Sequence, residues 1–329
     1  MKLHKVYFSI LAVGILFLMC FHIFCGQISI STSDIFSSLF SYDENNTIHI
    51  LIREFRIPRM IMALLAGSSL AICGMLMQTL FNNPLAGPYV LGINSGASLV
   101  VALTLMTGIP FFTSDFGLVS AGILGSLLFG LIILLASFVV KSHVSLLLIG
   151  LMISSFVGAI ISVLESMSGA EELKQFTFWA MGSLQQVSLD QLPMISGVIF
   201  VAFLSVLFVI KPLNALVLGE SSAKNLGVNI QKVRILIIGI TSILVGVITA
   251  FCGPIAFIGL AIPNLTRILF KTQNHLILVI GNLLIGGMFL VLCDCIIQLV
   301  EPWLVFPINA FTSILGAPFV VYMLIKKLV

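Results

Sequence analysis

Three arginines lie three residues apart in the segment REFRIPR, at positions 53, 56 and 59. A guanidinium pairs with a carboxylate through two parallel hydrogen bonds, which suits arginine to binding acidic groups. The plainer interpretation is that these side chains anchor an apolar helix, since arginine can extend its charge to the lipid headgroups. Arg53, Arg56 and Arg59 therefore predict either a docking surface for acidic groups or an anchored helix end.

Residues 218–229, LGESSAKNLGVN, form a polar stretch of small residues between two long apolar runs. The stretch has no metal-ligand spacing and no pair of nucleophile and base. Its residues favour a short helix, with a serine as N-terminal cap and Gly227 where the helix would end. Such a helix could enter a groove on a partner protein. An ordinary loop is the equal alternative from the residues alone.

Residues that could catalyse a reaction or bind a metal are scattered. The five histidines are far apart in sequence, and the six cysteines lie in or at the ends of apolar runs without a CxxC pair. The chain contains no G-x-x-x-x-G-K-[ST], so it has no P-loop for a nucleotide triphosphate. We therefore expect no catalytic residue, no cofactor site and no metal site.

The composition decides which solvent surrounds the chain. Of its 329 residues, 60% are hydrophobic and only 8% are charged, and the mean hydropathy is +1.23. Soluble globular proteins carry about three times that share of charged residues. Apolar runs of about 20 residues recur, which is the length that a helix needs to cross a bilayer. The sequence predicts an all-α polytopic membrane protein, with residues 1–329 as a single transmembrane domain.

The number of spans follows from the charges. Nine apolar runs are clear, and a tenth, 254–270, is interrupted by Pro263 and carries Arg267. Basic residues accumulate on the cytoplasmic side of membrane proteins. A ten-span chain with both termini in the cytoplasm places 11 of the 15 basic residues inside, and nine spans cannot. The predicted spans are 6–25, 59–80, 89–108, 116–140, 143–164, 192–211, 235–252, 254–270, 276–298 and 307–325.

The first run could also be a signal peptide, because it follows the basic start MKLHK. It is followed by no clear cleavage site, so we interpret it as an uncleaved span. In this topology most acidic residues lie outside. The net charge of +3 therefore reflects orientation in the membrane and implies no nucleic-acid partner.

A transporter that couples to ions hides ionisable residues deep in its spans. Here Glu165, Asp294 and Arg267 lie near span ends, and the middle of the membrane holds little beyond Gln78 and some hydroxyl and amide side chains. An ion-coupled secondary transporter is therefore the less favoured alternative. The energy for transport is expected from a partner.

The segment 53–98 closely resembles the signature of the FecCD family of ABC-transporter permeases, which import iron–siderophore complexes, haem and vitamin B12. Three later stretches, AKNLGVN, CGPIAFIGLAIPNLTR and LGAPFVVYML, resemble later blocks of the same family. The resemblance therefore covers essentially the whole chain. Its residues in 53–98 are Arg56, Pro58, Arg59, Gly67, Leu70, Ala71, Gly74, Gln78, Asn83, Pro84, Leu85, Ala86, Pro88, Leu91, Gly92, Gly96 and Ala97.

The resemblance implies a permease that pairs with a second permease subunit, identical or paralogous, around a central pathway. It also implies that a cytoplasmic helix between spans six and seven sits in a groove on an ABC ATPase dimer, which binds the ATP. This coupling segment, 218–229, would contact the ATPase through Glu220, Ser221, Ala223, Lys224, Asn225, Leu226, Gly227, Val228 and Asn229.

On the outer side, the family uses the arginines of Arg-x-Pro-Arg to bind acidic residues of an external solute-binding protein. Arg56 and Arg59 match that motif by position, and Arg53 is added because it is close. The chain departs from the family at Asn264, where histidine is frequent, and at Gln298, where an arginine often follows Asp294 by four residues. The stretch EPWLVFPINAF (301–311) also lacks the usual glycine. These departures affect details of the outer face.

These inferences predict the permease subunit of an ATP-binding-cassette importer in the bacterial cytoplasmic membrane, in contact with lipid. An iron chelate, with a ferric siderophore favoured, is the expected cargo, and haem or cobalamin is the first alternative. The pathway is expected to have mostly apolar and weakly polar walls, including Gln78, Asn83 and Ser95.

Overall fold

The structure is a computed structural model that describes residues 2–107, 115–140, 143–301, 303–304 and 306–328. Throughout these residues the chain is helical, without a β-strand. The last residue of the predicted span 89–108 lies outside the described part. Each predicted span overlaps one apolar helix. These helices are α1 (Lys2–Phe24), α4 (Ile57–Leu80), α5 (Ile93–Thr107), α6 (Asp115–Val139), α7 (His143–Met167), α9 (Leu192–Leu216), α11 (Ile230–Cys252), α12 (Ile258–Phe270), α13 (His275–Val300) and α14 (Ile308–Leu328).

By length and composition, seven helices of the described chain can cross a membrane, and three shorter apolar helices accompany them, Ile93–Thr107, Ile258–Phe270 and Ile308–Met323. The all-helical membrane fold is therefore confirmed, whereas ten spans and cytoplasmic termini stay predictions. Two of the shorter helices begin later than predicted. Gly92 has a positive φ of 78° directly before α5, and Phe257 has a φ of 66° directly before α12. A right-handed helix cannot continue through that conformation.

Five shorter elements were not among the predicted spans. They are α2 (Thr32–Phe40), α3 (Thr47–Ile50), the π-helical turn η1 (Leu51–Arg56), α8 (Ala170–Met181) and α10 (Glu220–Asn225). The turn η1 joins α3 to α4, so helical structure runs without a break from Thr47 to Leu80. Pro58 cannot donate a hydrogen bond, and the wider π turn directly before it, with Ile57 N–H bonded to Ile52 O, accommodates that loss.

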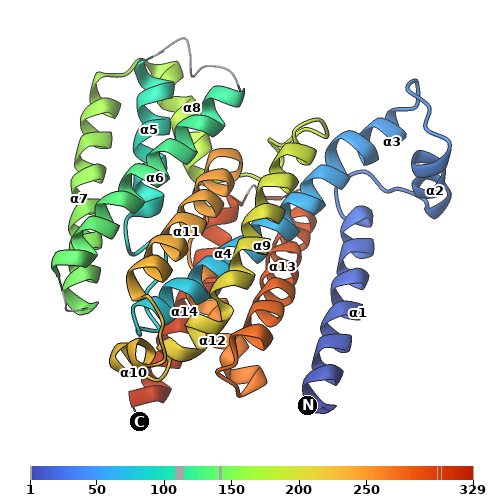
Figure 1. The fold of residues 1–329 in the computed structure, drawn as a ribbon. Coiled ribbons are helices and arrows are strands. Elements are labelled where there is room, and N and C mark those ends of the chain that lie inside the picture. The colour runs from blue at the N-terminus through green and yellow to red at the C-terminus, as the bar shows by residue number, and fades with distance from the viewer. Residues whose placement is uncertain (1, 108–114, 141–142, 302, 305, 329) are drawn as a thin grey trace.

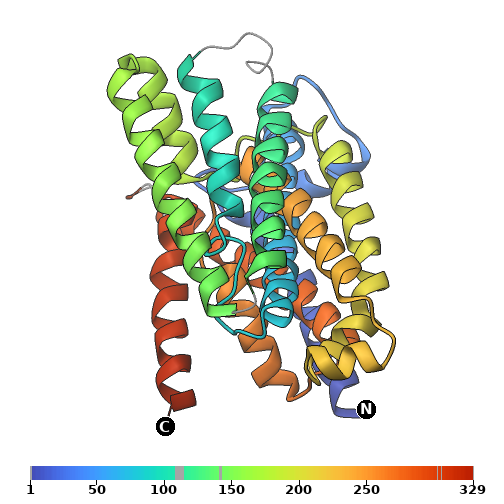
Figure 2. The same cartoon turned by 60° about the vertical axis from the view of Figure 1, so that its left-hand side comes forward.

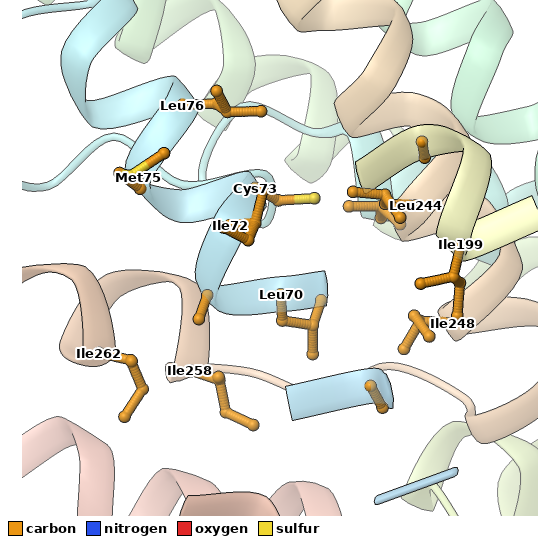
Figure 3. Packing of buried hydrophobic residues seen from close by; sticks show 14 of the residues in the cluster. Leu70, Ile72, Cys73, Met75, Leu76, Ile199, Leu244, Ile248, Ile258 and Ile262 are labelled. Carbon is orange, nitrogen blue, oxygen red and sulfur yellow. The ribbon is translucent and has the colours of Figure 1, made fainter. Parts of the chain in front are cut away.

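The helix α4 lies at the centre of the bundle. In Figure 1 it runs obliquely through the middle, with α1 at one side and α7 at the other, and Figure 2 shows the long helices side by side. Most side chains of α4 are buried. Figure 3 shows Leu70, Ile72 and Cys73 of α4 among isoleucines and leucines of α9, α11 and α12. The apolar runs in the sequence are thus partly membrane surface and partly protein core.

Glycines let α4 approach its neighbours closely. A Cβ atom added to Gly67 would lie 2.2 Å from the carbonyl oxygen of Gly286 on α13, and one added to Gly74 would touch the carbonyl of Gly259 on α12. Small residues at such crossings are typical of helix packing in membranes.

The two ends of the bundle differ. Both chain termini lie at the same end as α10, and α2, α3 and α8 lie toward the other end (Figure 1). At the α10 end, His4 Nε2 lies 3.2 Å from Phe270 O, and His275 N donates to Asn214 Oδ1 at 2.9 Å. The candidate coupling segment and the arginine segment 53–59 are therefore at opposite ends of the molecule.

Candidate coupling and docking sites

The segment 218–229 contains the short helix α10, as its residues favour. A serine cap was wrong, because the capping position is Gly219, with a φ of 96° and no side-chain hydrogen bond. The helix ends as predicted at Gly227, whose φ is 82°. Gly227 N–H bonds to Lys224 O at 2.9 Å and Val228 N–H to Ala223 O at 3.0 Å. This is a Schellman motif, in which a left-handed glycine satisfies the last carbonyls of a helix.

Within this segment one face is buried and the rest is exposed. Ala223 is fully buried and Val228 packs partly against the core. Leu226 is 65% exposed, although it is a large apolar residue. The other exposed members are Leu218, Gly219, Ser221, Ser222, Lys224, Asn225, Gly227 and Asn229. Beside α10 lies a hollow of about 490 Å³ lined by Glu220, Lys224, Asn229 and Arg234, among others. The segment thus presents small and polar groups and two large apolar side chains, Leu218 and Leu226.

The three predicted docking arginines have different surroundings. Arg53 is exposed, and its guanidinium lies 4.4 Å from the centre of the Tyr42 ring. Arg56 is only 6% exposed, and it donates to Ile23 O at 2.5 Å and to Ile28 O at 2.6 Å. Arg56 thereby attaches the end of α1 to the start of α4. Of the three, Arg53 presents its charge most openly.

Arg59 binds an acidic residue of its own chain. Its Nε donates to Asp294 Oδ2 at 2.8 Å and its Nη2 to Asp294 Oδ1 at 2.9 Å. A second carboxylate, that of Glu301, lies 3.8 Å from Nη1. The side chain of Asp294 is 2% exposed and that of Arg59 is 12% exposed. This bidentate pair therefore joins α4 to α13 inside the protein.

His22 also belongs to this cluster, and the sequence did not reveal it. His22 is fully buried, and its Nε2 lies 2.7 Å from Asp294 Oδ2 and 2.8 Å from Gln298 Nε2. From their scattered positions the histidines were expected to form no catalytic or metal site. One signal was available, because His22 lies within an apolar run, where a polar side chain needs a partner. Asp294 near the end of another apolar run was the candidate partner.

Of the predicted pathway residues, the structure brings two together. Gln78 and Asn83 line a hollow of about 250 Å³ that also includes Asn264 and Arg267. Gln78 is buried, and it accepts a hydrogen bond from Arg267 and donates one to Leu260 O. The Oδ1 atom of Asn83 accepts from Leu85 N–H. Ser95 is not among the residues that line this hollow, and donates to Ser154 Oγ of α7 at 3.1 Å.

Comparison with known proteins decides the assignment. The model of the FecCD transport family matches residues 14–326. This chain belongs to the FecCD transport family.

Individual FecCD relatives match over nearly their full length. The hemin transport system permease protein HmuU of Yersinia pestis is 32% identical, over 92% of this chain and 90% of its own. The vitamin B12 import system permease protein BtuC of Vibrio parahaemolyticus is 33% identical, over 97% and 93%. A solved chain described as an inward-facing metal-chelate type ABC transporter shares the fold, with a TM-score of 0.86 at 28% identity over 98% and 99%. The FecCD chain is therefore a membrane permease of an ABC importer.

The departures from the usual FecCD pattern have partners in the structure. Asn264 Nδ2 donates to Pro84 O at 3.0 Å and to Leu260 O at 2.8 Å, so it ties α12 to the Asn-Pro-Leu-Ala stretch. Gln298 Nε2 donates to Asp294 Oδ2 at 3.0 Å. In the stretch 301–311, Asn309 Oδ1 accepts from Ala256 N–H at 3.1 Å. Asn264 thus bonds to a neighbouring segment through a neutral amide, and Gln298, besides its bond within α13, lies 2.8 Å from His22 Nε2 of α1.

Proposed function

We propose that this permease carries an iron chelate, with a ferric siderophore as the favoured cargo, across the bacterial cytoplasmic membrane. Hemin and vitamin B12, after which two relatives are named, are both metal chelates, which supports this class of cargo. The seven helices that are long enough to cross a membrane and the three shorter apolar helices would form ten spans with both termini in the cytoplasm. The chain itself would bind no cofactor and catalyse no reaction, because a partner would hydrolyse the ATP.

The observation that carries this proposal is the exposed helix α10 at the end of the bundle that also holds both termini. The Schellman motif fixes the end of this helix, and the side chain of Leu226 is exposed beside it. This helix would bind in a groove on a cytoplasmic ABC ATPase dimer. Glu220, Ser221 and Lys224 would contact that groove from the first turns of the segment, and Asn225 to Asn229 from its end.

At the opposite end, an external solute-binding protein would dock near 53–59. Arg53 supports this role most directly, since its charge is exposed. Arg56 and Arg59 would contribute by holding the surface in place, with the partly exposed edge of Arg59 available beside Glu301. Inside the membrane, a second permease subunit would complete the pathway, to which Gln78, Asn83 and Ser95 would contribute weakly polar groups.

The first test is co-purification from native membranes in mild detergent. Leu226→Glu places a charge on an exposed side chain of α10, and Gln273→Glu places the same charge on an exposed residue of the loop before α13, at the same end of the molecule. We expect an ATPase with the wild type and with Gln273→Glu, and its loss with Leu226→Glu at unchanged permease abundance. A wild type that is stable but brings down no ATPase would contradict the proposal and favour ion coupling.

The cargo is tested separately, by uptake into proteoliposomes that contain the purified complex and its binding protein. A ferric siderophore, hemin and cobalamin would be offered in turn, each with and without ATP inside. ATP-dependent uptake of the ferric siderophore alone supports the favoured cargo. Uptake of hemin or cobalamin alone would still support an ABC importer, with that compound in place of the siderophore as its cargo.

A further inference from the structure

One guanidinium at the α10 end connects three separate elements. Arg234, near the start of α11, donates through Nη2 to Glu220 Oε1 of α10 at 3.0 Å and through Nη1 to Ser137 O of α6 at 2.6 Å. Its side chain is 14% exposed and that of Glu220 is 40% exposed. Among the described residues, this is the only salt bridge that α10 makes. Arg234 was not among the residues that the sequence singled out.

The helix α10 is short, and besides this connection it packs against α9 and α11. A helix of six residues is far shorter than the about 12 that are marginally stable in water. Glycines with positive φ flank it, Gly219 at 96° and Gly227 at 82°, and neither has another atom within 4 Å of an added Cβ. Both flanks therefore turn at a glycine that lies in open space. The buried Ala223, the Schellman motif at Gly227 and the Glu220–Arg234 pair together hold the helix.

The third element, α6, is well placed to pass movement onward. Ser137 lies in the last turn of α6, where main-chain carbonyls have no partner within the helix and carry partial negative charge. Arg234 therefore acts as a cap for α6 and as a partner of α10 at once. The helix α6 packs along both α5 and α11 through the bundle. A displacement of α10 would pull on the end of α6 through a single rigid, planar group.

The guanidinium also keeps one donor unused. Its Nε is buried and has no hydrogen-bond partner among the described residues. A buried donor without an acceptor is costly, and the cost falls when a rearrangement supplies one. The adjoining hollow of about 490 Å³, lined also by Gln231 and Asn229, leaves room for the side chain to move. Both observations suit a group that changes partners between two arrangements of α10.

We propose that Arg234 is a positioning residue that transmits the movement of α10 to α6 when the ATPase pair closes. The inference rests on the proposed function and adds a residue and a route to it. Arg234→Gln would leave the exposed docking groups of α10 in place and break the transmission. Glu220→Gln would weaken it less, because the amide oxygen still accepts a hydrogen bond from Arg234.

The test measures movement at each helix in the complex with its ATPase, in a background in which the exposed Cys20 is replaced by serine. Spin labels at Ser222, which is not among the predicted ATPase contacts, and Leu276 report α10 against α13, and labels at Leu135 and Leu276 report α6 against α13. All three side chains are exposed. Distances are measured by pulsed electron paramagnetic resonance before and after trapping with ATP and vanadate. Lys232→Gln, which removes an exposed cation two residues from Arg234, is the matched control.

We expect ATP to shift both distances in the wild type and in Lys232→Gln. In Arg234→Gln the α10 distance should still shift, the shift at α6 should be lost, and the ATPase should still co-purify. A normal shift at α6, or loss of the ATPase at unchanged permease abundance, would overturn the proposal. If Arg234→Gln does not fold, Arg234→Lys decides, because lysine keeps the charge and lacks the planar fork that reaches both acceptors. A reduced shift at α6 then supports the route, and a normal one overturns it. Failure of the proposed function looks different, because the wild type would then bind no ATPase.

Discussion

The guanidinium of Arg59 and the carboxylate of Asp294 lie 235 residues apart in sequence and meet through two hydrogen bonds of 2.8 and 2.9 Å. This pair turns a residue expected on a docking surface into a link between α4 and α13. Arg53, two turns earlier, is exposed and lies over the Tyr42 ring instead. The two arginines should therefore respond differently to mutation.

For stability, Arg59→Gln should be far more damaging than Arg53→Gln. Removing one partner of a buried ion pair costs about 3–5 kcal/mol, since the other charge stays buried. Loss of an exposed cation–π contact costs about 0.5–1 kcal/mol. Thermal unfolding of the two variants in the same detergent measures the difference. Equal shifts would mean that the Asp294 carboxylate is adequately compensated by His22 and Gln298 alone.

For docking of the solute-binding protein, Arg53 should matter more than Arg59. Arg53→Glu places a negative charge on the exposed surface and should weaken capture of the solute-binding protein by about tenfold or more. Lys174→Glu makes the same change on an exposed residue of α8. We expect that control to bind normally in a surface-plasmon assay with the permease in nanodiscs. Weaker binding by both variants to the same degree would point to a general effect of charge and not to a site at 53–59.

The sequence predicts local features of this chain well. Apolar run length places the long helices, and Gly227 marks the end of α10, because both depend on neighbouring residues. The start of α5 was misplaced at 89, since the turn through Gly92 involves no break in hydropathy. The π turn before Pro58 and the glycine cap of α10 likewise leave no clear trace in composition.

Long-range partners could not be predicted in the same way. His22, Asp294 and Gln298 meet only because α1 packs against α13 in one register. The sequence shows that Gln298 replaces an arginine that is frequent in the family. The structural role of this glutamine depends on the buried His22 beside it, which the sequence does not show. The same holds for Arg234, whose two acceptors come from α6 and α10.

At the crossing of α4 and α13, Gly67→Ala should destabilise the protein by about 1–3 kcal/mol, as overpacking does. The added Cβ would lie 2.2 Å from Gly286 O and 2.8 Å from Leu290 Cβ, so the helices must separate. Gly239→Ala on α11 is the matched control, because nothing lies within 4 Å of its added Cβ. That variant should gain about 0.5–1 kcal/mol from helix propensity. Denaturation in detergent measures both, and similar behaviour of the two variants would argue against a close crossing at Gly67.

At the end of α10, Gly227→Val should loosen the coupling segment, whereas Gly227→Asn should be tolerated. A β-branched residue in the left-handed conformation costs about 1–2 kcal/mol, and asparagine adopts that conformation much more readily. No atom lies within 4 Å of an added Cβ, so a difference between the variants is due to the backbone and not to a clash. Hydrogen exchange should show the Val228 amide, bonded to Ala223 O in the wild type, exchanging faster in Gly227→Val only. ATPase co-purification should fall in the same variant. Equal exchange in both would mean that the glycine is not needed to form this end of the helix.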